Sequence, residues 1–203
     1  MRKKNILVMG LSMALVAVIS IGGTLAYLGA TDGPVNNTFT FADNLSVDLY
    51  ETIGGEKVQT GHAFGDVVPG VPVDKDANFN MTSASVKSVV FVKIEAIDKT
   101  AGGKTGVDMI LDMAGTDLTA YNVEGDHYGE YYIIVDKGDT TEKDIFSKVT
   151  APVSAQYDSN VLNDIKISIS AVQYDGYAGV DYATPDIEAI VDAAYAAKPP
   201  YQA

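Results

Sequence analysis

Apolar and polar side chains alternate along several stretches of the chain with the two-residue period of a half-buried strand. The alternation is clearest in residues 45–50, 88–96 and 165–171, and residues 128–135 are rich in the aromatic and β-branched types that strands favour. The apolar faces of the three alternating segments are Leu45, Val47 and Leu49, then Val90, Val92, Ile94 and Ala96, then Ile165, Ile167, Ile169 and Ala171. In residues 88–96 we expect that face to line a core.

Turn signals separate these segments and define the fold class. Residues 77–81 form one more short strand candidate, and glycine-containing turns interrupt the strand pattern at residues 54–55, 69–70, 102–103, 137–139 and 175–176. Many short strands with such punctuation are typical of an antiparallel sandwich and not of a parallel α/β sheet. We therefore expect an all-β, jelly-roll-like antiparallel β-sandwich.

Two segments break the strand pattern and favour helices. Thr184 and Pro185 form a good helix start, with Asp186 and Glu188 near the positive end of the helix dipole. An apolar stripe at helical spacing then ends before Pro199 and consists of Ile187, Ile190, Val191, Ala194 and Tyr195. We expect this C-terminal amphipathic helix to pack on the sandwich, and a partner-binding helix is the alternative. A short helical insertion is expected in residues 107–114, because Val107, Ile110, Leu111 and Ala114 share helical spacing.

The first 26 residues have the pattern of an export signal. Basic residues at positions 2–4 precede an uncharged, largely apolar run from Ile6 to Leu25, and small residues stand at Thr24 and Ala26. This pattern predicts cleavage between Ala26 and Tyr27. A retained membrane anchor is the alternative, because the apolar run is nearly long enough to span a bilayer.

The segment directly after the cleavage site, residues 27–41, is a donor-strand candidate. Such a strand can add to an exposed sheet edge of another copy, where backbone hydrogen bonds provide affinity and alternate side chains set the register. One donor and one acceptor used head to tail propagate into a filament unless the rotation closes a ring. The alternative is that residues 38–41 are the first strand of the same molecule and residues 27–37 a frayed tail. The donor face carries Val35, Asn37, Phe39 and Phe41, with Phe39 and Phe41 as its anchors.

The composition of the mature chain disfavours binding to nucleic acid. We assign residues 42–183 to one β-sandwich domain and residues 184–203 to the helix and tail. Three of the 14 basic residues precede Tyr27 and all 27 acidic residues follow it, which leaves 11 basic residues and a formal charge of −16. Such a chain repels nucleic acid and anionic membranes. Because Cys is absent, disulfides and thiolate chemistry are excluded.

Catalytic and metal-binding motifs are weak, so we expect neither an enzyme nor a cofactor. The chain has two His residues, His62 and His127, without an HExxH pair, and it has no Gly-x-Ser-x-Gly elbow. Glu124 and Asp126 beside His127 make a zinc site conceivable, although a solvated turn accounts for them better. The oxygen-rich loops at residues 136–139 and 158–160 lack the EF-hand spacing that calcium sites show.

Tyrosine is abundant, with 12 residues in the chain. Six of them fall into two groups, Tyr128, Tyr131 and Tyr132, and Tyr174, Tyr177 and Tyr182. Aromatic side chains suit cross-strand pairs in a sheet, and they also suit contacts with other subunits or with carbohydrate. We expect a structural use.

The junction of signal and mature chain resembles the TasA/camelysin family, exported proteins that a SipW-type signal peptidase matures. The resemblance covers both ends of the chain better than its middle, and relatives often carry an aromatic and a polar residue where this chain has Leu28 and Gly29. The matching segments, in order, are residues 23–28, Asp32, residues 37–40, residues 45–49, Glu51, the acidic-apolar-x-Pro-Gly turn at residues 66–70, residues 73–75 and the late strand at residues 167–173.

The resemblance implies a jelly-roll domain, secretion to the cell surface and, for the best-known members of the family, filaments of the biofilm matrix. An exported domain without Cys is common in monoderm bacteria, so we expect a bacterium of this kind as the source. The implied partners are other copies of the chain, a SipW-type signal peptidase and an accessory matrix protein. Two alternatives remain open. The first alternative is an accessory subunit that caps or nucleates such filaments, and the second is a camelysin-like surface metallopeptidase.

Overall fold

A computed structural model of the protein describes residues 45–59, 65, 67–100, 102–124, 127–156 and 160–201. The chain divides into two units, Met1–Phe41 and Ala42–Ala203, and all described residues lie in the second. The predicted signal peptide and donor strand lie outside the described residues, and with them Ala26, Tyr27, Val35, Asn37, Phe39 and Phe41.

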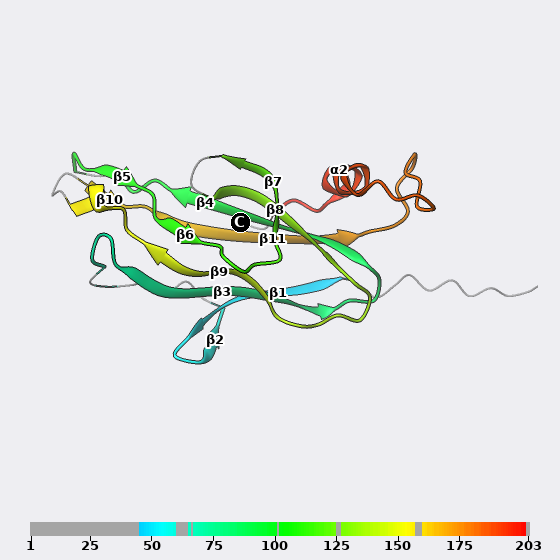
Figure 1. Ribbon diagram of the computed structural model, residues 1–203, viewed down its shortest axis with the longest axis horizontal. Helices are drawn as coiled ribbons and strands as arrows, with labels where there is room; N and C mark the ends of the chain where they lie inside the picture. The colour runs from blue at the N-terminus through cyan, green and yellow to red at the C-terminus, as the bar shows by residue number, and fades with distance from the viewer. Residues whose placement is uncertain are drawn as a thin grey trace, which may run out of the picture. The chain divides into compact units, whose positions relative to one another are not determined.

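Two antiparallel sheets form the two layers of this unit (Figure 1). The first sheet has the order β2 (Glu56–Val58), β1 (Ser46–Ile53), β3 (Pro72–Ser83), β9 (Lys143–Thr150) and β6 (Ile110–Asp112). The second has the order β11 (Asp164–Gln173), β4 (Ser88–Ile97), β8 (Tyr128–Val135) and β7 (Thr119–Glu124). A short parallel pair joins β10 (Asn160–Leu162) to β5 (Thr105–Val107), and a 3₁₀ turn spans Val153–Gln156. The predicted all-β sandwich is confirmed.

The core lies between the two sheets, where the alternating apolar residues of facing strands meet. Phe79 from β3, Val92 from β4 and Phe146 from β9 are fully buried there. The predicted core positions Val90, Val92 and Ile94 belong to this cluster, whereas Ala96 near the end of β4 is only half-buried. Burial of each large side chain in this layer contributes about 1.5–3 kcal/mol to the stability of the domain.

The opposite face of β4 is buried as well, because the C-terminal helix covers it. Val89 and Phe91 point away from the sandwich core and belong to a second apolar cluster with Ile190 and Val191 of the helix. This explains why residues 89–92 are apolar on both faces of the strand. The prediction that the helix packs on the sandwich is therefore confirmed.

Helix α2 spans Ile187–Ala197 and begins two residues after the predicted start. The side chain of Asp186 accepts hydrogen bonds from the backbone N–H groups of Glu188 and Ala189, and it is therefore the N-cap. The Thr184 hydroxyl donates instead to Asp181 in the preceding turn. Ile190, Val191 and Ala194 are buried as the predicted stripe requires, whereas Ile187 is 41% exposed. No helix in the described ranges is long and apolar enough to cross a membrane.

The predicted helical insertion at residues 107–114 is wrong. The segment contains the end of β5 and the whole of β6, and Leu111 pairs with Val149 of β9. Met109 and Leu111 are buried while Ile110 is 43% exposed, which is the period of a strand. A helix of two turns is marginal on its own, so the available edge of β9 decided the structure of this segment.

Candidate functional site

The first candidate feature of the sandwich is the edge strand β11. It pairs with β4 over ten consecutive residues, from Asp164 opposite Ile97 to Gln173 opposite Ser88, without a register shift. Within the described residues no strand pairs with its other side. In this part of the chain, a row of backbone N–H and C=O groups on that side therefore has no strand partner, and such a row can pair with another strand.

The inner face of β11 is only partly covered. Its apolar residues Ile165, Ile167 and Ile169 pack against the core but stay half-buried. Their partners on β4 are sealed, since Ile94 opposite Ile167 is 1% exposed and Val92 opposite Ile169 is 0% exposed. Burial thus falls from complete to partial over a single strand spacing.

The facing strand of the first sheet shows the same incomplete cover. β1 contacts β11 across the side of the sandwich (Figure 1). Its inner residues Leu45, Val47 and Leu49 are half-buried, and β2 pairs only with residues 51–53 of β1. The half-covered side chains of β1 and β11 together form what we call the open edge.

β11 carries few of the features by which edge strands usually avoid pairing. Those features are Pro, bulges, charged side chains that point inward, and lysine or other charged side chains along the edge. The pairing of β11 with β4 has no bulge, and its two charged residues, Asp164 and Lys166, alternate with the inward-facing apolar residues. A long, regular and apolar edge of this kind is a template for strand addition.

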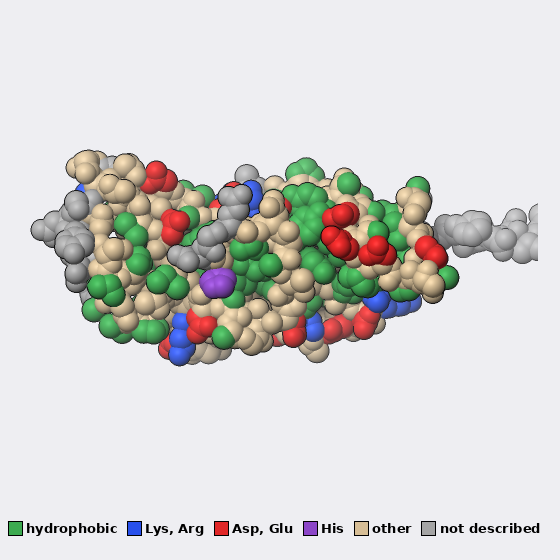
Figure 2. Space-filling view, turned by 45° about the horizontal axis from the view of Figure 1, so that its top comes forward, with side chains coloured by type: hydrophobic (Ala, Val, Ile, Leu, Met, Phe, Trp, Pro, Cys, Tyr) green, Lys and Arg blue, Asp and Glu red, His purple; other side chains and the backbone are tan. Residues whose placement is uncertain are grey.

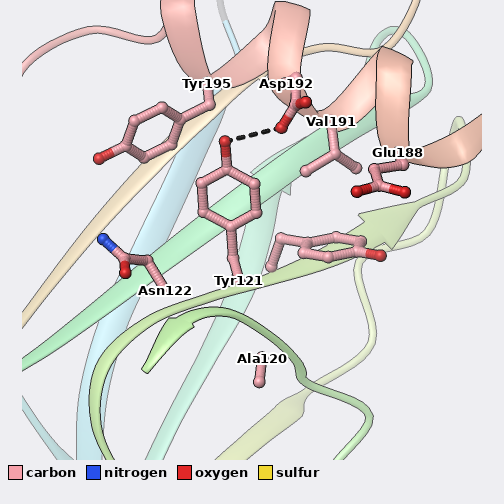
Figure 3. Close-up of a pocket in the computed structure, with 8 residues that line it drawn as sticks. Ala120, Tyr121, Asn122, Glu188, Val191, Asp192 and Tyr195 are labelled. Atoms are coloured by element: carbon pink, nitrogen blue, oxygen red, sulfur yellow. Dashed lines mark hydrogen bonds between the residues drawn. The ribbon is translucent and has the colours of Figure 1, made fainter. Parts of the chain in front are cut away.

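A second feature is a groove between α2 and strands β7 and β8, with a volume of about 570 Å³ (Figure 3). Figure 3 shows side chains that descend from α2 towards Tyr121 of β7. Figure 2 shows acidic side chains beside hydrophobic surface on this face of the molecule. We call the groove between α2, β7 and β8 the tyrosine groove. Its lining consists of Ala120, Tyr121, Asn122, Tyr132, Glu188, Val191, Asp192 and Tyr195.

Hydrogen bonds to carboxylates hold two of its three tyrosines. The Tyr121 hydroxyl donates to Asp192 at 2.8 Å, and the Tyr195 hydroxyl donates to the buried Glu130 at 2.5 Å. Burial and the bond to Asp192 raise the pKa of Tyr121 to about 12, and the bond to Glu130 together with burial raises the pKa of Tyr195 to about 12. Both hydroxyls are therefore neutral donors at physiological pH.

The rings of the groove form a rigid aromatic wall. The Tyr121 ring lies 4.8 Å from that of Tyr195 and 6.4 Å from that of Tyr132, measured between centroids. Phe91 supports both Tyr121 and Tyr195 edge-on from the sheet below. Such edge-to-face pairs are each worth about 0.5–1.5 kcal/mol beyond their buried area, so the wall is preorganised.

Those candidate metal ligands that the structure describes form no common site. His127 is exposed in the turn between β7 and β8, and its backbone carbonyl accepts a bond from the Tyr131 hydroxyl. His62, Asp126, Asp158 and Ser159 lie outside the described residues. Among the residues that are described, no three His or acidic side chains gather closely enough to hold a metal ion.

The two predicted tyrosine groups divide between the two apolar clusters. Tyr131 is buried in the sandwich core, and Tyr128 packs against that core. Tyr132, Tyr174, Tyr177 and Tyr182 belong to the cluster under α2. Their packing is structural, as expected, but Tyr132 also lines the tyrosine groove.

The sequence did not single out the groove residues Tyr121 and Asp192, and it assigned Glu188 only to the start of the helix. One signal was present, since Glu188, Asp192 and Tyr195 recur at helical spacing along one side of α2.

Comparison of the chain with known protein families, with curated proteins and with solved structures finds no match.

Proposed function

We propose that the protein is a secreted structural subunit of the extracellular or biofilm matrix, which assembles by strand donation. In this proposal residues 27–41 of one copy pair with the open edge of the next. Repetition of this contact builds a filament at the cell surface. The observation that carries the proposal is the ten-residue edge strand β11, whose outer side has no strand partner among the described residues and whose inner face is half-buried.

The donor and the open edge are complementary in length and pattern. Residues 34–41 alternate with the period of a strand and place Phe39 and Phe41 on one face. Beside β11, that face would cover Ile167 and Ile169 on one sheet and Val47 on the other. Full burial of each Phe contributes about 1.5–3 kcal/mol, and the backbone bonds to the edge add to it.

Export provides the control of assembly in this proposal. While residues 1–26 remain attached, the donor is tethered at the membrane. Cleavage before Tyr27 by a SipW-type signal peptidase releases it on the outside of the cell. The resemblance of residues 23–28 and 37–40 to the TasA/camelysin family supports the same order of events.

The first experiment compares purified chains that begin at Tyr27. The unaltered chain should form filaments visible by electron microscopy. The variant Phe39→Ala/Phe41→Ala should stay monomeric by light scattering with an unchanged far-UV circular dichroism spectrum. The matched control is Thr38→Ala/Thr40→Ala on the opposite face, which should still polymerise. Filaments from the pure chain also distinguish a main subunit from an accessory one.

The second experiment separates donation to another copy from pairing within one molecule. Ile167→Lys places a charge on the inner face of β11 and should block the acceptor. Its matched control is Lys166→Ala on the other face. A mixture of Ile167→Lys with Phe39→Ala/Phe41→Ala joins one intact donor with one intact acceptor, so it should give a heterodimer and no polymer. Monomers in every sample would overturn the proposal.

A further inference from the structure

The tyrosine groove has the chemistry of a site for a small organic cation. We infer that it binds the ammonium group of a small alkylammonium ligand between the rings of Tyr121 and Tyr132 and the carboxylates of Glu188 and Asp192. The groove belongs to α2, β7 and β8 and is separate from β11. The inference is therefore independent of filament assembly.

The charge of the groove selects a cation. Glu188 and Asp192 stand one helical turn apart on α2, a spacing at which like charges repel. Neither carboxylate forms an ion pair within the described residues. None of the eight lining residues is basic. A bound cation relieves this repulsion, whereas an anion adds to it.

The aromatic wall favours an organic ammonium over a metal ion. Tyrosine faces attract ammonium groups, and aromatic cages are a common way to bind alkylated ones. A divalent metal requires several convergent oxygen ligands, but three of the eight lining residues are tyrosines, and one carboxylate oxygen of Asp192 already accepts from Tyr121. The volume of about 570 Å³ suits a small molecule.

Neighbouring tyrosines already show this preference. The Lys198 ammonium lies 4.7 Å from the centroid of Tyr195 and 3.9 Å from that of Tyr201. Lys57 and Lys87 lie in the same way over Tyr50 and Tyr174. Over Tyr121 and Tyr132 the described residues place no lysine, so none of these lysines competes there with an external ammonium.

The test compares choline with its neutral carbon isostere, 3,3-dimethylbutan-1-ol. Saturation-transfer NMR with the chain that begins at Tyr27 observes the methyl protons of the ligand, and therefore works for monomer and filament. Choline should bind saturably and at least about fivefold more tightly than the isostere, because only choline carries the charge. A parallel arm with Nα-acetyl-lysine methylamide reports whether the lysine of a peptide binds better than the free ligand.

Variants locate the binding. Glu188→Gln/Asp192→Asn keeps the shape of the groove and an acceptor for Tyr121, and it should weaken choline binding at least about fivefold. Tyr132→Leu should weaken it similarly. Glu56→Gln on β2 is the matched control for loss of a carboxylate and should bind as the unaltered chain does. Equal binding of choline and its isostere, or binding that both groove variants retain, would overturn the inference, as would tighter binding of a neutral sugar.

Discussion

A single carboxylate, that of Asp139, organises the turn between β8 and β9. It accepts bonds from the backbone N–H of Thr141 at 2.9 Å and from the Thr141 hydroxyl at 2.6 Å, and the Lys143 ammonium lies 3.0 Å away. The bonds from Thr141, followed by that from Lys143, lower the pKa of Asp139 to about 2. The sequence presents this residue as a calcium ligand candidate, but its oxygens are engaged within the turn.

The lowered pKa makes the contribution of Asp139 dependent on pH. The folded pKa is about 2 and the unfolded value about 3.9, so the stabilisation is complete above about pH 4 and is lost as the pH falls towards 2. Asp139→Asn should lower the free energy of unfolding by about 1 kcal/mol at pH 6, after allowance for solvent screening. Urea titrations of both proteins at several pH values measure this difference.

The control for this prediction is Asp136→Asn in the same turn. Its side chain is exposed and only approaches Lys87 at 3.7 Å, so the change should stay within about 0.5 kcal/mol. A difference between Asp139→Asn and the unaltered protein that stayed constant from pH 6 to pH 2 would contradict the assignment.

Another residue-scale constraint, at Gly129, is invisible in the sequence pattern. Gly129 lies inside β8 with a φ of 143°, and a Cβ atom there would stand 2.3 Å from the backbone oxygen of Asn122 on β7. The close approach of two backbones explains why the aromatic run of residues 128–135 contains a glycine.

At the scale of elements, strand β4 contributes to both apolar clusters of the molecule. One face of β4 packs into the sandwich core and the other packs against α2. The helix is therefore an integral part of the fold. Within α2 the buried positions are Ile190, Val191 and Ala194, while Ile187 at the first turn is 41% exposed. The apolar stripe is therefore anchored at its centre.

Two matched truncations test this anchoring. Ile190→Ala removes a side chain that is 0% exposed and should lower the free energy of unfolding by about 2–4 kcal/mol, because it leaves a cavity under the helix. Ile187→Ala makes the same chemical change at an exposed position and should cost under about 1 kcal/mol. Urea unfolding followed by circular dichroism measures both. Equal costs for the two variants would show that α2 is not seated as described.

At the scale of the whole molecule, charge and the open edge act in opposite directions. The edge favours association, whereas a formal charge of −16 on the chain from Tyr27, with 11 basic and 27 acidic residues, opposes it. Repulsion between copies is long-ranged at low ionic strength and is screened at physiological salt. In the proposed assembly, salt therefore controls the rate of encounter.

Assembly should accelerate when salt is added. A rise from about 10 mM to about 150 mM NaCl shortens the Debye length from about 30 Å to about 8 Å, so the lag before light scattering increases should shorten several-fold. Phe39→Ala/Phe41→Ala should scatter weakly at both salt concentrations, since it lacks the donor anchors. A lag that is independent of salt would show that repulsion between subunits does not limit assembly.

The sequence by itself determined the local structure of most strands and of the helix. In residues 45–50, 88–96 and 165–171 the two-residue period decides the strand, because one face must leave water while the other does not. The buried centre of α2 followed from its helical period in the same way. The prediction failed for residues 107–114, because an eight-residue pattern is compatible with both the strand period and the helical period. Pairing with β9 decided in favour of a strand.

Only the tertiary structure decided which strands stand at an edge and which side chains meet. The half-buried face of β11 depends on its place outside β4, and the tyrosine groove depends on residues far apart in sequence, such as Tyr121 and Asp192, which are separated by 71 positions. Periodicity reports how a side chain is oriented relative to its own element. It carries no information on which neighbour that element receives, because neighbours are set by long-range packing of the whole core.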